Sequence, residues 1–546
     1  MIEKPFILLM SESFEKNWEF PAFSDYNGET VSYREAGEYI YWLHALYSFH
    51  NVKKGEKITL IGKNSKNWAI IYMSVITYGA VVVPILPDFT PQDLSNLVDH
   101  SDSVLMFVAD SIYKTMDISG LKKLRGIYLV ENFQTATESD KEGKLSFNKS
   151  KKEILPEDFS FKNLNIHISQ NNELALISYT SGTTGFSKGV MLPHNSLMAN
   201  VMFAQKHMPL LPKDKIVSFL PLAHSYGMAF EFLFPVTLGC HIIFLTKTPS
   251  PQIITEAFQK IRPRLILSVP LVIEKIYKKR VLPKISANPV KTLLKIPLFN
   301  IIIYKKIRKS LFEAFGGNFK EIVIGGAPFN PDAEDLFRKI KLPFSVGYGM
   351  TECGPLISYA GWTNAKLRSA GKIVDTLEIR IDSEDPYHVN GEIQVRGENV
   401  MLGYFKNEKA TKEILDDDGW LHTGDLGIID KENFVFIRGR NKSMLLGSSG
   451  QNIYPEEIEA KINNLPFVVE SLVIQEGAKL VALIVPEEEW IKVHNLTDEL
   501  LQEFFLKQRQ ILNKELPAYA SISEFRLHKE EFEKTPKKSI KRFLYS

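Results

Sequence analysis

Cysteine is scarce in this chain: only Cys240 and Cys353 occur among 546 residues. Two cysteines so far apart in sequence argue against a disulfide framework and against a zinc site, and they fit a reducing compartment such as the cytoplasm. The formal net charge is only +2, so it gives no support for nucleic-acid binding, which usually shows a strongly basic domain. With 44% apolar and 24% charged residues, the composition is typical of a soluble globular protein.

The chain also lacks a clear membrane span or signal peptide. Residues 1–14 carry acidic side chains on both sides of a short apolar run, unlike the charge pattern of a signal peptide. Residues 69–86 contain no charge and approach the length of a membrane span. However, Gly79 and Pro84 interrupt this stretch and residues 80–83 are mostly β-branched, so we predict a buried helix, a turn at Gly79 and a buried strand.

Apolar, β-branched runs alternate with amphipathic stretches over most of the sequence. This alternation predicts an α/β fold with largely parallel sheets. The length of 546 residues is too great for one core, so we expect two or more domains. The predicted strands are 57–62, 103–108, 126–130, 174–177, 216–220, 241–245, 265–269 and 321–324, and predicted helices include 91–99 and 251–261.

The pattern changes towards the C-terminus. Residues 378–381 and 392–395 alternate like a β-hairpin, and after the RGRNK run at 438–442 the pattern begins again. The last part predicts helices at 455–463 and 499–515 and strands at 470–475 and 479–484. We therefore predict a large multi-subdomain N-terminal α/β domain (1–438), a hinge (439–442) and a small mobile C-terminal α+β domain (443–546).

One loop concentrates residues suited to binding a polyphosphate. Tyr179–Gly189 reads YTSGTTGFSKG and follows a predicted strand. Its glycines let backbone N–H groups approach an anion closely, its hydroxyls add donors, and Lys188 adds a point charge. The ordinary P-loop is excluded, because five residues separate Gly182 from Lys188 and glycine follows the lysine instead of preceding it. A flexible polar loop is the alternative.

Two strand-end turns carry further candidate residues. Glu321–Pro328 is a strand that runs into Gly325 and Gly326, and ligands of open α/β sheets lie beyond the carboxyl ends of strands. Gly347–Glu352 (GYGMTE) places an aromatic ring between glycines, with a hydroxyl and a carboxylate after it. The ring is suited to stack on a base and the carboxylate to hold Mg²⁺. The alternative is an ordinary turn with a surface glutamate.

A third turn ends in a carboxylate. Gly419–Asp425 (GWLHTGD) places Asp425 where it can accept hydrogen bonds from ribose hydroxyls. Arg438, Arg440 and Lys442 follow and offer cationic donors for phosphate. Each feature is moderate evidence by itself, but their joint occurrence in this order favours a nucleotide site.

Six ordered motifs together resemble the AMP-forming acyl-CoA synthetases of the adenylate-forming superfamily: Tyr179–Gly189, Pro221–Gly227, Gly325–Pro328, Gly347–Glu352, Gly419–Asp425 and Gly439–Glu459. The resemblance covers essentially the whole chain. Residues 270–276 (PLVIEKI) and the inserted segment 281–310 are similar to the long-chain fatty-acid branch. The resemblance implies two steps: a fatty-acid carboxylate attacks the α-phosphate of ATP, giving acyl-AMP and pyrophosphate, and the coenzyme A thiol then displaces AMP.

The resemblance also implies roles for individual residues. Thr180 and Glu352 would bind Mg²⁺, Thr351 would contact the α-phosphate, and His224 would line the meeting point of the acyl and pantetheine groups. A structural histidine is the alternative for His224. The implied ATP- and AMP-binding residues are Thr180, Ser181, Gly182, Thr183, Thr184, Lys188, Gly325, Gly326, Ala327, Tyr348, Gly349, Met350, Thr351, Asp425, Arg440 and Lys442, and those for coenzyme A are Gly447, Ser449 and Gly450.

The catalytic lysine is where this sequence departs from the family pattern. The family places it near the C-terminus after a Thr-Pro turn, and the spacing of the long-chain branch, counted from Thr535, falls on Ser539. Lysines flank this position at 537, 538 and 541. A one-residue shift through a bulge would present Lys538, which we predict as the catalytic lysine, and Lys541 is an alternative. In another alternative the basic tail is a solvated surface.

The implied partners are fatty acid, ATP and coenzyme A, with no nucleic acid. Segment 275–310 is basic and apolar, so it could rest peripherally on anionic lipid at the inner membrane surface; a helical hairpin packed on the domain is the alternative. Two other functions stay open: delivery of the acyl group to a carrier-protein phosphopantetheine or into a light-emitting oxidation, and a non-catalytic acyl- or nucleotide-binding homologue. No motif marks the acyl chain length or the oligomeric state, although the family often forms homodimers.

Overall fold

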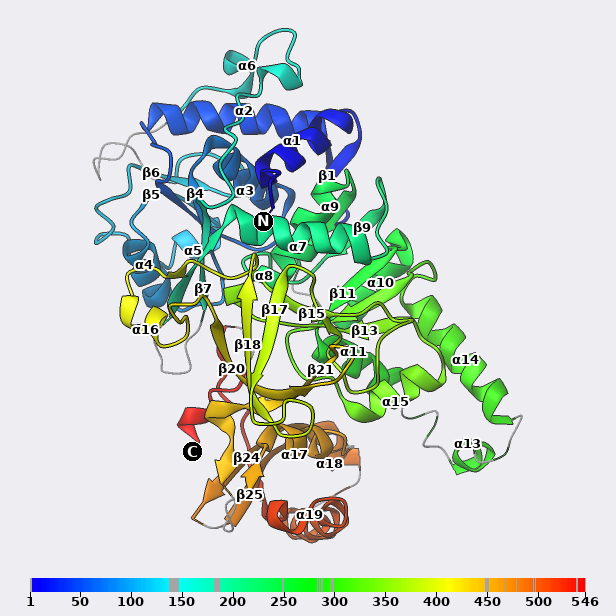
Figure 1. The fold of residues 1–546 in the computed structure, drawn as a ribbon. Coiled ribbons are helices and arrows are strands. Elements are labelled where there is room, and N and C mark those ends of the chain that lie inside the picture. The colour runs from blue at the N-terminus through cyan, green and yellow to red at the C-terminus, as the bar shows by residue number, and fades with distance from the viewer. Residues whose placement is uncertain are drawn as a thin grey trace.

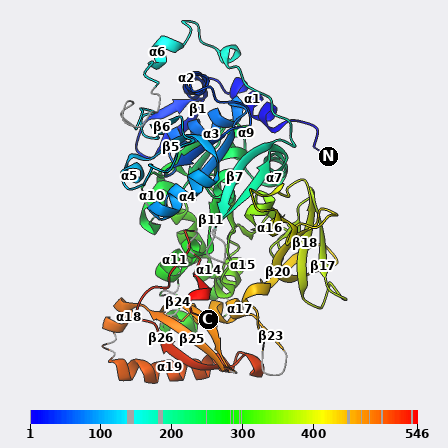
Figure 2. The same cartoon turned by 90° about the vertical axis from the view of Figure 1, so that its left-hand side faces the viewer.

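The computed structural model has a mixed α/β architecture, with a large N-terminal domain and a smaller C-terminal domain (Figure 1). The C-terminal part, orange to red, lies at one end of the large domain in both views (Figures 1 and 2). The structure describes residues 2–136, 147–180, 187–247, 250–281, 283, 285, 288–294, 296, 299–446, 451–465, 467–477, 479–493, 495, 497–536 and 539–545.

A seven-stranded sheet forms the centre of the large domain, with the order β19-β8-β7-β4-β3-β5-β6. Strands β7, β4, β3, β5 and β6 are parallel, whereas β7–β8 and β8–β19 pair antiparallel. Parallel strands are buried on both faces, which is why their sequences are continuous apolar runs. The strands are β3 Lys57–Ile61, β4 Val81–Ile85, β5 Ser103–Val108, β6 Gly126–Leu129, β7 Leu174–Thr180, β8 Lys188–Pro193 and β19 Gly403–Tyr404.

The uncharged stretch 69–86 folds as the sequence predicted. Helix α3 (Lys66–Tyr78) ends at Gly79, whose φ of 87° is left-handed, and β4 follows. Nearly all of α3 and β4 is buried in the core, so the missing charges reflect burial inside the protein. Among the described residues, no helix is both long enough and apolar enough to cross a membrane.

Two further sheets extend the large domain. A four-stranded sheet has the order β2-β1-β10-β9, and a parallel three-stranded sheet has the order β11-β12-β13. Helix α10 (Pro251–Ile261) lies between β10 and β11 in sequence, as the alternating pattern predicted. The strands are β1 Pro21–Asp25, β2 Thr30–Ser32, β9 Lys215–Ser218, β10 His241–Phe244, β11 Leu265–Ser268, β12 Glu321–Ile324 and β13 Phe344–Val346.

Two antiparallel sheets, β14-β15-β16 and β17-β18-β20-β21, carry the GYGMTE and GWLHTGD motifs. The predicted hairpin is confirmed, since Ile379 of β17 lies opposite Val395 of β18. The first motif falls on β14 and the second runs into β20, so sheet geometry positions both. The strands are β14 Tyr348–Gly349, β15 Leu356–Tyr359, β16 Lys372–Ile373, β17 Leu377–Asp382, β18 Gly391–Gly397, β20 Leu421–Ile429 and β21 Val435–Arg440.

The C-terminal part has its own hydrophobic core beneath a sheet of order β24-β25-β26. Two helices, α17 (Pro455–Ile462) and α19 (Asp498–Asn513), supply much of that core together with β24 (Val468–Glu476), β25 (Lys479–Pro486) and β26 (Ile522–Leu527). Its contacts with the large domain include polar ones: Asn464 donates to Asp332 at 2.8 Å, and Lys278 donates to the Asn463 carbonyl oxygen.

The remaining elements are short or cover the sheets. Helices are α1 Phe6–Lys16, α2 Tyr33–Phe49, α4 Pro91–His100, α5 Asp110–Tyr113, α6 Lys151–Ile154, α7 His194–His207, α8 Ser225–Gly227, α9 Phe234–Thr237, α11 Pro270–Ile276, α13 Asn288–Leu293, α14 Phe299–Ala314, α15 Pro331–Lys339, α16 Glu408–Lys412 and α18 Glu488–Val493. Segments η2 (Met228–Leu233) and η3 (Tyr277–Val281) are π-helical, and one-turn 3-10 helices are η1 Phe161–Asn163, η4 Thr351–Cys353, η5 Asn441–Ser443, η6 Ala518–Ala520 and η7 Arg542–Leu544. Strands β22 (Leu445–Leu446) and β23 (Asn452–Ile453) form a small ribbon.

Candidate active site

The predicted phosphate loop joins two antiparallel strands of the central sheet. β7 ends at Thr180, β8 begins at Lys188, and these two residues are paired across the ladder. The Thr180 hydroxyl donates to the Lys188 carbonyl oxygen at 3.4 Å, so both ends of the loop lie side by side. The predicted Ser181, Gly182, Thr183 and Thr184 lie outside the described residues.

Tyr348, Asp425 and Arg440 form one hydrogen-bonded cluster. The Tyr348 hydroxyl donates to Asp425 Oδ2 at 2.7 Å, and Arg440 Nε donates to Asp425 Oδ1 at 3.1 Å. Asp425 and Arg440 lie opposite each other on β20 and β21, whereas Tyr348 comes from β14. Three different sequence motifs each predicted one of these residues as nucleotide-binding, and the fold brings the three together.

Burial dominates the charge state of Asp425. Its side chain is 8% exposed, and burial raises its carboxyl pKa, while the Arg440 charge and the Tyr348 hydroxyl act in the opposite direction. An ionised carboxylate that accepts two hydrogen bonds keeps lone pairs for further donors such as vicinal hydroxyls. The Arg440 side chain is 65% exposed, so it is the member of the cluster that faces solvent.

Tyr404, which the sequence motifs did not include, contacts two predicted site residues. Its hydroxyl donates to Glu352 Oε1 at 2.8 Å, and Lys188 Nζ lies 4.7 Å from the centre of its ring. The short strand β19 places it there by pairing with β8, with Tyr404 opposite Val190. A two-residue strand leaves no periodic signal in the sequence. The link from Glu352 through Tyr404 to Lys188 therefore becomes visible only in the folded structure.

The two residues predicted to bind Mg²⁺ both carry oxygen donors, which Mg²⁺ prefers. Glu352 is buried beside Tyr404, and Thr180 is the last residue of β7. In the part of the chain that the structure describes, no three His, Cys, Asp or Glu side chains gather into a metal-binding group. A magnesium ion held here would therefore take its other ligands from phosphate and water, as Mg²⁺ commonly does.

The Gly325–Pro328 motif forms an accessible edge at the carboxyl end of β12. The Gly325 N–H donates to the Ser268 carbonyl oxygen of β11, and Gly326 has a left-handed φ of 89°, which favours glycine. Residues 326–328 are exposed. The Tyr226 hydroxyl donates to the Val323 carbonyl oxygen at 3.0 Å, so the Pro221–Gly227 motif is attached to the same strand end.

The turn from Gly349 to Glu352 is tightly packed. A Cβ on Gly349 would lie 2.1 Å from the Pro355 carbonyl oxygen, so only glycine fits. Met350 is half-buried, and Thr351 is buried at the start of η4. The turn thereby directs Tyr348 towards Asp425 and Glu352 towards Tyr404, and a change in its shape would move both contacts.

The C-terminal residues of the prediction are described only in part. Lys442 is exposed in η5, directly after Arg440 and Asn441. His224, in the large domain, is half-buried and precedes α8. The predicted Gly447, Ser449, Gly450 and Lys538, and also Lys537, lie outside the described residues.

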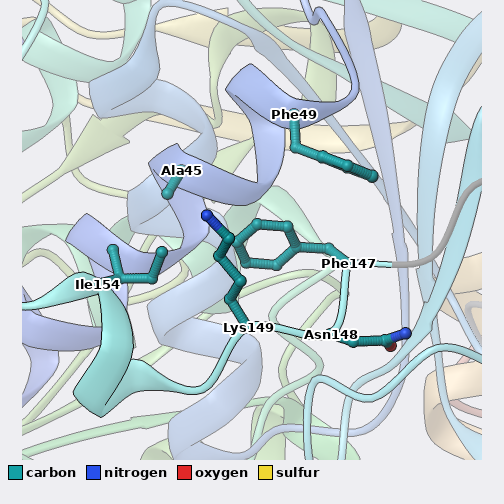
Figure 3. A pocket seen from close by; sticks show the side chains of 6 residues that line it. All are labelled: Ala45, Phe49, Phe147, Asn148, Lys149 and Ile154. Atoms are coloured by element: carbon teal, nitrogen blue, oxygen red, sulfur yellow. The ribbon is translucent and has the colours of Figure 1, made fainter.

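A pocket elsewhere in the large domain contains none of these residues. It is lined by Ala45 and Phe49 of α2, by residues 147–149 and by Ile154 of α6 (Figure 3). Figure 1 places α2 and α6 at the end of the large domain opposite the C-terminal domain. The pocket is therefore separate from the candidate active site.

Comparisons with known proteins identify the family to which the chain belongs. A family model described as AMP-binding enzyme matches residues 10–405, and one described as AMP-binding enzyme C-terminal domain matches residues 442–545. The chain is 26% identical to the long-chain-fatty-acid–CoA ligase FadD15 of Mycobacterium bovis over 466 residues, which are 80% of this chain and 73% of that protein. It is 29% identical to the peroxisomal long chain acyl-CoA synthetase 7 of Arabidopsis thaliana over 503 residues, 85% and 69% of the two proteins.

Solved structures share the fold. The ATP-bound RpMatB-BxBclM chimera B1 has a TM-score of 0.77 at 21% identity, covering 99% of this chain and 97% of that one. The o-succinylbenzoate CoA synthetase MenE from Bacillus subtilis, in complex with an acyl-adenylate intermediate, has a TM-score of 0.75 at 20% identity, covering 100% and 99%. Since the first family model spans most of the sequence and the motif resemblance pointed to the same enzymes, the chain belongs to the AMP-binding enzyme family, as an adenylate-forming acyl-CoA synthetase.

Proposed function

We propose that this protein activates a long-chain fatty acid with ATP, forming acyl-AMP and pyrophosphate, and then transfers the acyl group to coenzyme A. The observation that carries the proposal is the Tyr348–Asp425–Arg440 cluster, in which residues of three separate motifs meet at one buried carboxylate. The long-chain substrate is supported by the names of relatives that are 26% and 29% identical.

Each residue has a task in the first step. Asp425 accepts hydrogen bonds from the ribose hydroxyls, Tyr348 and the 325–327 edge frame adenine, and Lys188 holds the departing pyrophosphate. Glu352 and Thr180 would hold Mg²⁺, which would supply positive charge to neutralise the phosphates. Attack on phosphorus spreads negative charge over oxygens, so positioning and fixed positive charge supply the catalysis and no covalent nucleophile is required.

The second step uses a different surface of the same site. Thr351 contacts the α-phosphate, His224 lies at the acyl carbonyl, and Gly447, Ser449 and Gly450 admit the narrow pantetheine arm. The hinge at 439–442, with Lys442 near its end, lets the C-terminal domain present a different face for each step. Each of these assignments follows from the match between this sequence and the family motifs.

An assay of ATP–pyrophosphate exchange across fatty acids of rising chain length tests the proposal. We expect exchange to increase about fourfold per added methylene until the acyl site is filled, since burial of each CH₂ contributes roughly 0.8 kcal/mol. Addition of coenzyme A should then yield acyl-CoA. Absence of exchange with every acid would contradict the activity, and transfer only to an acyl carrier protein would favour the alternative acceptor.

We also propose that the protein is cytoplasmic and contacts the inner membrane surface peripherally. The C-terminal half of α14 is anchored through buried Ile307 and Leu311, whereas Phe299, Ile301 and Ile302 of its N-terminal half are 50%, 50% and 53% exposed. Figure 1 shows α13 and this end of α14 projecting from the large domain. Residues 275–310 contain no Asp or Glu, and exposed Lys305, Lys306, Arg308 and Lys309 follow the apolar side chains.

Vesicle flotation tests this surface. Each basic residue near an anionic membrane contributes about 1 kcal/mol, so the variant Lys305→Glu/Lys306→Glu should bind phosphatidylglycerol vesicles at least about tenfold more weakly than wild type. Neither protein should bind pure phosphatidylcholine strongly. The control Leu506→Ser removes a similarly exposed side chain from α19 and should leave binding unchanged. Wild type that stays with the soluble fraction at low salt would contradict the proposal.

A further inference from the structure

Glu231 is a fully buried acid just after the motif that contains His224. It lies in the π-helical segment η2, and its Oε2 accepts hydrogen bonds from the backbone N–H groups of Phe219 and Leu220, each at 2.9 Å. π-helical turns are rare and are frequent at functional sites. Glu231 therefore reaches back from η2 to the connection between β9 and α8.

Asn64 holds the same connection through other atoms. Its Nδ2 donates to the Leu220 carbonyl oxygen at 2.7 Å, and its Oδ1 accepts the Leu222 N–H at 3.0 Å. Residues 219–222 lie between a strand and a helix, so their buried backbone groups need partners outside a ladder. Glu231 and Asn64 supply those partners, and together they fix the path of residues 219–222.

This connection determines where His224 lies. The His224 N–H donates to the Pro221 carbonyl oxygen at 3.0 Å, and the Met228 N–H donates to the His224 carbonyl oxygen at 2.9 Å. Gly227 packs tightly against residue 221, because a Cβ on Gly227 would lie 2.7 Å from the Pro221 carbonyl oxygen. A shift of residues 219–222 would therefore be transmitted to His224.

The second oxygen of Glu231 is unsatisfied. Oε1 is buried and has no hydrogen-bond partner, and burial raises the Glu231 pKa well above its ordinary value, against the lowering effect of the Leu220 and Phe219 N–H groups and the Ser218 side chain. Two backbone N–H groups need only one acceptor oxygen, and an unpartnered buried polar atom lowers stability. Local features that oppose stability concentrate at functional sites, so the acid at this position indicates more than a packing role.

We propose that Glu231 is a positioning residue for the acyl-transfer step: its carboxyl group fixes the 219–222 connection and thereby sets His224 at the acyl carbonyl. This inference rests on the proposed function, in which His224 serves acyl transfer. The groups that we assign to adenylation, Tyr348, Asp425 and Glu352, lie on other elements, so the two half-reactions should respond differently to a change at Glu231.

The test compares Glu231→Leu with Glu231→Gln in separate half-reactions. For Glu231→Leu we expect transfer from preformed acyl-AMP to coenzyme A to fall by about 100-fold, the cost of a misplacement of roughly 1 Å, with pyrophosphate exchange reduced by less than about threefold. Glu231→Gln should restore transfer to near the wild-type rate, because its amide oxygen can accept the same two N–H groups.

Glu321→Leu is the matched control. Glu321 is another buried acid whose pKa is raised by burial, and it lies at the opposite end of β12 from Gly325. This variant should have lower thermal stability, and the rates of pyrophosphate exchange and of transfer to coenzyme A should change by the same factor. Equal loss of both half-reactions in Glu231→Leu, in proportion to lost stability, would overturn the inference. If Glu231→Leu does not fold, Glu231→Asp, which keeps the acid but shortens its reach, should show the same selective loss. Wild type without thioester formation would contradict the proposed function instead.

Discussion

Replacement of Asp425 by alanine is expected to reduce kcat/KM for ATP in pyrophosphate exchange by at least about 100-fold. Each hydrogen bond to a charged group contributes roughly 1.5–3 kcal/mol, and the carboxylate is proposed to accept two from ribose. The substitution also leaves the Tyr348 hydroxyl and Arg440 Nε without their shared acceptor. We expect most of the loss in KM, because ribose is held equally in the ground state and the transition state.

The pH dependence of ATP binding should carry the signature of Asp425. Burial raises its pKa above the ordinary 3.8, so the carboxylate becomes protonated, and a poorer acceptor, at a higher pH than an ordinary aspartate. KM for ATP should therefore rise as the pH falls through that raised pKa. The same shift means that ionisation of Asp425 opposes folding at pH above the raised pKa, and this penalty disappears as the pH falls below the unfolded-state pKa.

Two variants separate the nucleotide role of Asp425 from a folding role. Asp425→Asn keeps the shape and removes the charge, so its free energy of unfolding should not fall at neutral pH, while KM for ATP rises about tenfold. Asp430→Asn changes a carboxylate at the end of the same strand that pairs with Lys366, outside the cluster, and should leave KM unchanged. An unchanged KM for ATP in Asp425→Ala would show that the ribose assignment is wrong.

The sequence predicted regular elements well wherever burial repeats along the chain. The 69–86 stretch and the β17–β18 hairpin are confirmed, because continuous apolar runs and strict alternation are direct consequences of two-sided and one-sided burial. Motif order nominated Tyr348, Asp425 and Arg440, and the sheets bring those three together. The motifs did not show why these three residues lie together. The structure shows that three strands from two sheets meet at the Asp425 carboxylate.

Residues whose roles depend on tertiary contacts could not be predicted from the sequence. Tyr404 reaches Glu352 only because a two-residue strand pairs with β8, and Asn64 reaches residues 219–222 from a distant part of the chain. Glu231 reads as a polar interruption of an apolar run, and its function depends on a π-helical turn that no periodicity marks. These contacts join residues that are distant in sequence or depend on an irregular turn, so the local sequence pattern does not predict them.

Two lysines near the C-terminus form ion pairs within their own domain. Lys534 pairs with Glu470 at 2.8 Å and Lys541 pairs with Glu533 at 3.3 Å, both within the C-terminal domain. The Thr535 N–H donates to the Ser539 carbonyl oxygen at 2.8 Å. Lys538 remains our prediction for the catalytic lysine, and Lys541 remains the alternative.

Lys538→Ala is therefore expected to slow adenylation by about 100- to 1,000-fold, the usual effect of removing one preorganised charge that stabilises a transition state. Transfer from preformed acyl-AMP to coenzyme A should change by less than about threefold, because the hinge motion that we propose would present another face of the C-terminal domain for that step. Pyrophosphate exchange and single-turnover transfer measure the two steps separately.

Lys541→Ala is the matched control: it removes a lysine from the same tail and breaks only the Glu533 pair, so both half-reactions should stay within about threefold of wild type, in line with the small contribution of an exposed ion pair. Lys537→Ala distinguishes the neighbouring position. If adenylation collapses in Lys537→Ala and survives in Lys538→Ala, the one-residue shift that we infer is wrong and the lysine is Lys537. If all three variants adenylate normally, the basic tail is a solvated surface, and the positive charge that stabilises the transition state must come from Lys188 and Arg440.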